Sequence, residues 1–100
     1  MKVSYTAVFV YNKDGISVII PACPGCITCG QSDSQAKDMA RDALKSWLEA
    51  TIFDNRDVPV HNLPIDFTPI KLQHWVKEHK PTWPKYSRWS VKTITVNLEV

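Results

Sequence analysis

Residues 18–30 read V-I-I-P-A-C-P-G-C-I-T-C-G, and this stretch decides how the chain folds. The β-branched run that ends at Ile20 is typical of a strand, and Pro21 ends it because proline cannot donate to a strand ladder. Pro24-Gly25 predicts a turn, and Cys26 to Gly30 is predicted to return as a short strand. The stretch therefore predicts two strands joined by a tight connection.

The residues before this stretch predict a hairpin. Asn12 to Gly15 contain an Asp-Gly pair, which is typical of a hairpin turn, and Ile16 to Ile20 form the second strand. The first strand has one alternating face, made of Val3, Tyr5, Ala7, Phe9 and Tyr11.

The residues after it predict one long helix. Ser32 is a suitable N-cap, and Gln35 three residues later completes a capping-box pattern. Apolar residues recur at helical spacing and are expected to pack on the sheet: Ala36, Met39, Ala40, Ala43, Leu44, Trp47 and Leu48.

The last third predicts a second, short helix and a final strand. Thr68-Pro69 offers an N-cap and a first-turn proline, and the helix is expected to run over 69–79, with residues 60–68 as loop. Alternation from Ile94 to Val100 predicts a strand, with a bulge near residue 93. The predicted fold is α+β: a small, mainly antiparallel sheet with one long helix on one face and a short extra helix.

Composition limits the class of protein. The 100 residues, 44% of them hydrophobic, predict a single domain over residues 1–100. The longest apolar run, Ile16 to Ile20, is too short to cross a bilayer, and no export pattern precedes it. A cytoplasmic, membrane-free protein is therefore expected. Residues 71–100 hold six Lys/Arg and two Asp/Glu, so this part is a candidate basic surface.

The order of these pieces, with their motifs, resembles the HicB antitoxin family. The matching residues are Tyr5 to Phe9, Asp14-Gly15, Val18 to Cys26, Thr28 to Gly30, Gln35-Ala36, Ala43 to Glu49 and Val58-Pro59. The resemblance implies a partial ribonuclease-H-like fold, β-β-β-α-β, that lacks the active site of that enzyme.

The resemblance also implies a partner. Family members pair with a small RNA-cleaving toxin, HicA, and cover its RNA-binding surface and catalytic histidine. Ala22 stands where the family often has an acidic residue, and Gln35 replaces a usual glutamate. Many members add a C-terminal DNA-binding domain, which the chain is expected to lack, so operator binding is not carried over. Residues 60–90 are longer than the usual connection.

Two kinds of chemistry are considered and set aside. Cys23, Cys26 and Cys29 have a spacing that can hold zinc or an iron–sulfur cluster, but strand geometry would point their sulfurs apart. No metal or cofactor is therefore predicted. Asp38 and Asp42 are spaced i, i+4 on the solvent side of the helix, and no catalytic motif is present, so no enzyme is predicted.

The main hypothesis is a binding module that occludes a HicA-like toxin, through the polar helix residues Asp38, Asp42 and Glu49. A homodimer through an edge strand is also expected. The alternative is a nucleic-acid-binding or orphan regulatory protein that uses residues 71–92, where basic side chains would meet phosphates and exposed aromatic rings would stack on bases. Its candidate residues are Lys77, Lys80, Trp83, Lys85, Tyr86 and Arg88, with Trp83 and Tyr86 expected to be exposed.

Overall fold

The computed structural model describes residues 2–58 and 69–98, with the side chains of 69–71 left aside. Its elements are β1 (Lys2–Asn12), β2 (Gly15–Ile19), β3 (Ile27–Gly30), α1 (Asp33–Phe53), α2 (Pro69–His79), the 3₁₀ turn η1 (Lys80–Thr82) and β4 (Arg88–Asn97). The predicted α+β fold is confirmed, including the long helix and the short helix over 69–79. The predicted N-cap at Thr68 and the loop over 60–68 lie outside the described residues.

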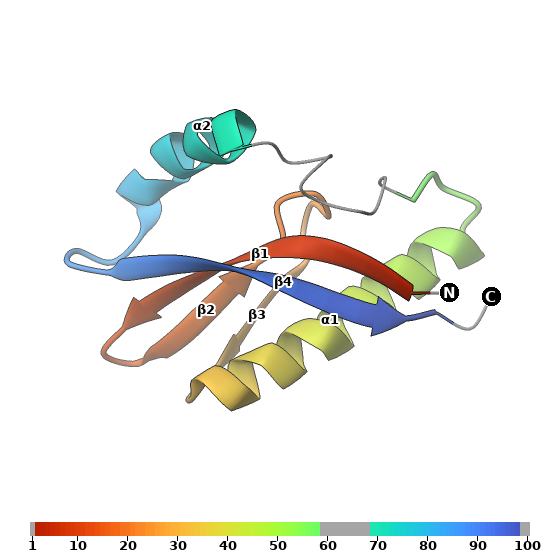
Figure 1. The fold of residues 1–100 in the computed structure, drawn as a ribbon, viewed down its shortest axis with the longest axis horizontal. Coiled ribbons are helices and arrows are strands. Elements are labelled where there is room, and N and C mark those ends of the chain that lie inside the picture. Colours follow the sequence, from red (N-terminus) through yellow and green to blue (C-terminus); the bar gives the residue numbers. More distant parts are fainter. Residues whose placement is uncertain (1, 59–68, 99–100) are drawn as a thin grey trace.

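The four strands form one antiparallel sheet in the order β3-β2-β1-β4 (Figure 1). The hairpin forms as predicted, with Asn12 opposite Gly15 at its turn. The first and last strands pair one to one, from Lys2 opposite Asn97 to Tyr11 opposite Arg88. The predicted bulge near residue 93 is therefore wrong.

The sheet carries apolar residues on both faces, and this explains the wrong bulge. Ile94 and Val96 point into the core beneath α1, whereas Val91 points to the opposite face, directly across from the buried Val8. Apolar residues of both parities therefore fit one regular strand. Figure 1 shows α1 crossing one face of the sheet, with α2 on the other side.

Helix α1 begins as the capping pattern predicts. The Ser32 hydroxyl accepts a hydrogen bond from the Gln35 N–H at 3.1 Å, and the Gln35 side chain accepts one from the Gln31 N–H at 2.6 Å. Ala36, Ala40, Leu44 and Leu48 are fully buried against the sheet. Met39 is 41% exposed, so its assignment to the core stripe is wrong. Its position lies at the margin of a stripe that four other residues fill.

The Cys23–Cys26 turn is fastened to the middle of α1. The Cys26 N–H donates to the Cys23 carbonyl at 2.9 Å, and Gly25 takes a φ of 85°, which only glycine adopts readily. The Trp47 indole N–H donates to the Pro24 carbonyl at 3.0 Å. The connection between β2 and β3 is thus held against the helix.

Neither helix in the described ranges has the combination of length and apolar character that a bilayer crossing requires.

Candidate partner-binding surfaces

The outer face of α1 carries the three carboxylates that the sequence singles out. Asp38, Asp42 and Glu49 are all exposed, as expected. They do not form an acidic patch of their own, because three cations lie on the same helix: Lys37, Arg41 and Lys45. Arg41 pairs with Asp38 at 3.0 Å. The face has a net charge of zero, and it offers alternating charges rather than one sign.

The basic and aromatic residues of the last third do not form one surface. Trp83 is half-buried, with its ring centre 6.3 Å from that of Trp75 and 6.3 Å from that of Trp89. Its expected exposure is therefore wrong, because the sheet face opposite α1 is apolar and draws the indole inward. Lys77 and Lys80 are exposed on α2 and η1.

Tyr86 is exposed as expected, at 92%. It takes a φ of 67°, which is uncommon outside glycine, and the Lys85 ammonium lies 5.3 Å from its ring centre. Arg88 instead stacks over Tyr11, with its guanidinium carbon 4.7 Å from that ring. Of the two aromatic candidates, Trp83 and Tyr86, only Tyr86 is exposed for a base to stack on, and Lys85 lies beside it.

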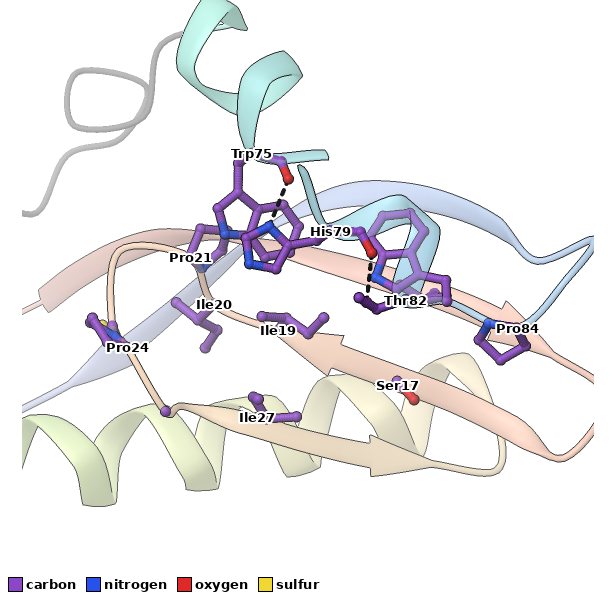
Figure 2. A pocket seen from close by; sticks show the side chains of 14 residues that line it. Ser17, Ile19, Ile20, Pro21, Pro24, Ile27, Trp75, His79, Thr82 and Pro84 are labelled. Carbon is purple, nitrogen blue, oxygen red and sulfur yellow. Dashed lines mark hydrogen bonds between the residues drawn. The ribbon is translucent and has the colours of Figure 1, made fainter. Parts of the chain in front are cut away.

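A groove that the sequence did not suggest lies between α2 and the β2–β3 end of the sheet (Figure 2). It has a volume of about 610 Å³. Its lining includes Ile19, Pro21, Pro24, Ile27, Trp75 and His79. Figure 2 shows Trp75 and His79 above the strand that carries Ile19. Their rings are stacked at 4.2 Å. The groove joins segments some fifty residues apart, so no local motif could predict it.

A polar network fixes the first turn of α1 to the sheet. Tyr11 donates to the Asp33 carboxylate at 2.7 Å, and the Lys92 ammonium lies 3.2 Å from the same oxygen. These two hydrogen bonds, the Tyr11 bond foremost, hold the pKa of Asp33 below its usual value of 3.8. The network is an anchor between distant segments.

The three cysteines differ in burial. Cys23 and Cys26 are buried in the core, whereas Cys29 is exposed on the opposite face of the sheet. Burial raises the pKa of the Cys26 thiol to about 11, so it stays protonated near neutral pH. Among the residues that the structure describes, no three His, Cys, Asp or Glu side chains gather as a metal site would require.

Comparison with known proteins relates the chain to bacterial toxin–antitoxin systems. A family model described as a HicB-like antitoxin of such a system matches residues 6–99. A UPF0150 protein of Thermoplasma acidophilum is 30% identical over 59 residues, which are 58% of this chain and 86% of that protein.

Solved structures share the fold. A chain of a toxin–antitoxin complex from Streptococcus pneumoniae superposes with a TM-score of 0.74 at 17% identity, over 97% of this chain and 70% of that one. A chain of a HicA3–HicB3 toxin–antitoxin complex gives 0.62 at 15% identity, over 97% and 99%. At these identities the likeness is one of fold.

Proposed function

The chain belongs to the HicB-like antitoxin family of bacterial toxin–antitoxin systems, and from this premise we propose that it binds and blocks a HicA-like toxin that cleaves mRNA. The family match over residues 6–99 carries the proposal. The structural neighbours support it, because two of them come from toxin–antitoxin complexes. The proposal implies a cytoplasmic location, where the toxin would meet its RNA.

Such an antitoxin acts by steric hindrance of its toxin. The family suggests a regulatory role without catalysis, and no residue of this chain is assigned a chemical step. A rigid scaffold suits occlusion, since a surface that is ordered before binding loses less conformational entropy on association. Here α1 is held at its first turn by Asp33 and at its middle by Trp47.

We propose the outer face of α1 as the surface that meets the toxin. Asp38, Asp42 and Glu49 would contact cations of a protein built to bind RNA, while the neighbouring Arg41 and Lys45 would set the register of docking. Exposed charges of this kind govern association rate and specificity more than affinity.

Co-purification with a HicA-like toxin, followed by an RNA-cleavage assay, tests the function. We expect the toxin to cut RNA alone and to stop when the chain is added in equimolar amount. Asp42→Lys should weaken inhibition, whereas Glu78→Lys, an exposed carboxylate on α2, should not. Undiminished cleavage in the presence of the chain would refute the antitoxin function. Full inhibition by Asp42→Lys would refute only the assignment of α1.

Direct binding of single-stranded nucleic acid is a second candidate, and the 92% exposure of Tyr86 beside Lys85 favours it. Stacking on an exposed ring and neutralisation of phosphates by Lys80 and Lys85 would supply the affinity. Binding should then fall steeply with salt and weaken in Tyr86→Ala. Absence of binding to RNA and DNA at low salt would remove this candidate.

A further inference from the structure

A pocket with polar walls lies at one end of the sheet, between two turns. One is the hairpin turn between β1 and β2, and the other, residues 84–87, leads directly into β4. Figure 1 shows both turns at the same end of the sheet. The pocket, here called the turn pocket, has a volume of about 350 Å³, which is in the range of small-ligand sites. The first turn lines it with Asn12, Lys13 and Asp14, and the second with Lys85, Tyr86 and Ser87.

Hydrogen bonds of the main chain order both walls of the turn pocket. In the hairpin turn, the Asp14 N–H donates to the side-chain oxygen of Asn12 at 2.9 Å. In the second turn, the Ser87 N–H donates to the Pro84 carbonyl at 3.1 Å. The two lysines take no part in these bonds, and within the described ranges neither ammonium group has a carboxylate partner. Both positive charges are therefore available to a ligand.

Tyr86 has a backbone conformation that the packing of the chain does not explain. It is the third residue of the 84–87 turn, and its φ of 67° lies in the left-handed region that favours glycine. A bulky residue in this region is strained, and such strain is typical of binding sites. Its ring is 92% exposed, so the fold gains little buried area from it. A ligand that covers the ring would supply the missing contact.

The Ser87 hydroxyl points to a ligand independently of Tyr86. Its oxygen is buried, and it has no hydrogen-bond partner in the described part of the chain. Buried polar groups are nearly always hydrogen-bonded, because an unpaired one loses its contact with water and gains nothing in return. Since Ser87 lines the turn pocket, a polar atom of a bound ligand would complete its hydrogen bonding.

We propose that the turn pocket binds one nucleotide. The base stacks on the Tyr86 ring, and the phosphate lies between the ammonium groups of Lys13 and Lys85. The Ser87 hydroxyl and the Asp14 carboxylate bind hydroxyl groups of the sugar. This assignment rests on the second candidate function, binding of single-stranded nucleic acid, and it names the residues that hold one nucleotide of the strand.

The Asp14 carboxylate favours a nucleotide over a bare phosphate. The walls of the turn pocket carry this one negative charge beside the positive charges of Lys13 and Lys85. A carboxylate repels a phosphate group, but it accepts hydrogen bonds from sugar hydroxyls and from amino groups of bases. A nucleotide brings an anion, hydrogen-bond donors and an aromatic ring, and each has a matching group here. A free monophosphate and one nucleotide of an RNA strand share this chemistry.

Fluorescence anisotropy of a short, labelled single-stranded RNA, titrated with the full chain at low salt, tests the turn pocket. Lys13→Glu should weaken binding by at least about tenfold, because a contact with phosphate becomes a repulsion. Lys2→Glu is the matched control, since Lys2 is an exposed lysine at the other end of β1 and the net charge changes equally. It should weaken binding by less than about twofold. Circular dichroism checks that each variant folds.

Two further variants separate a role in binding from a role in the fold. Tyr86→Gly removes the ring and suits the left-handed backbone, so it should weaken RNA binding without lowering the midpoint of chemical denaturation. Ser87→Ala removes a buried hydroxyl without a partner in the described chain, and it should have the same two effects. A lowered midpoint in both variants would mean that these residues serve the fold, and would overturn the proposal.

Nuclear magnetic resonance titrations with adenosine 5′-monophosphate and with inorganic phosphate identify the source of the nucleotide. Shifts of the Lys13 and Ser87 amides with the monophosphate would support a free nucleotide, and binding of the RNA alone would support a strand. Equal shifts with inorganic phosphate would refute the assignment to a nucleotide. RNA binding that Lys13→Glu leaves intact would refute the turn pocket and leave nucleic-acid binding standing. Failure of both RNA and monophosphate to bind at low salt would remove both.

Discussion

Gly30 lies where β3 passes against the first turn of α1, and its missing side chain sets how closely the two elements approach. A Cβ at this position would lie 2.6 Å from the Ala36 backbone nitrogen and 2.7 Å from its Cα. Gly30→Ala should therefore lower the free energy of unfolding by about 3 kcal/mol, as overpacking does. Chemical denaturation measures this loss.

Gly25 provides the matched comparison for that substitution. It has a φ of 85°, but no atom lies within 4 Å of a Cβ built on it. Gly25→Ala should cost only about 1 kcal/mol, for backbone conformation alone. Equal losses at the two glycines would show that helix packing does not depend on Gly30.

The Asp33 carboxylate links the stability of the fold to pH. Because its pKa is lower in the folded chain than its usual 3.8, ionised Asp33 stabilises the fold above the unfolded-state pKa. This contribution is lost as the pH falls through the lower, folded-state pKa. Asp33→Asn should thus lower the denaturation midpoint at neutral pH, and its difference from wild type should shrink in acid.

Tyr11→Phe checks the cause of that pH dependence. It removes the hydroxyl that donates to Asp33 at 2.7 Å and leaves the ring under Arg88. Part of the pH-dependent difference should disappear with it. A Tyr11→Phe chain with the full wild-type response to acid would mean that the cations Lys92 and Arg88 lower the pKa of Asp33 without help from Tyr11.

At the scale of elements, local patterns predict the strands and helices well, because apolar residues recur with a different spacing in each kind of element. The hairpin, the turn at Pro24-Gly25 and the cap at Ser32 all form where the sequence indicates. The errors arise where the environment of a residue is set by an element that is distant in the sequence. Val91 suggested a bulge only because the face of the sheet opposite α1 is also apolar, with Val8 and Val10 buried there.

The same limit applies to the candidate surfaces. Exposure of Asp38, Asp42 and Glu49 follows from helical periodicity alone, and the structure agrees. The inward turn of Trp83 does not follow from its sequence neighbours, which are prolines and lysines. It depends on Trp75 and Trp89, which the fold brings beside it.

Helix α2 is expected to be the element that opens most easily. Few of its described side chains meet the sheet: Trp75 and His79 line the groove over it, beside Trp83 from the turn that follows. Trp83→Ala should speed hydrogen exchange of α2 amides by about tenfold and leave β1 protected. Tyr86→Ala, at an exposed ring, is the control and should change neither. Uniform acceleration across the sheet would mean that α2 does not open separately.

At the scale of the whole molecule, the proposed toxin-binding face of α1 is compatible with the homodimer that the sequence analysis expects at an edge strand, because the two use different parts of the fold. Pairing of two copies at the marginal strand β4 would extend the sheet in its own plane, whereas α1 lies across one face of that sheet (Figure 1). A two-fold axis perpendicular to the sheet places both copies of α1 on the same side. Two toxin sites would then face one direction.

This geometry predicts a complex of two chains with two toxin molecules. Light scattering of the purified complex should give that mass for wild type, and Val91→Lys should reduce it to one chain with one toxin. Inhibition of RNA cleavage should survive in the smaller complex, because Val91 lies at the edge of the sheet and not on α1. A Val91→Lys chain that folds but no longer inhibits the toxin would show that the β4 edge itself contacts the toxin, and the two interfaces would then be one.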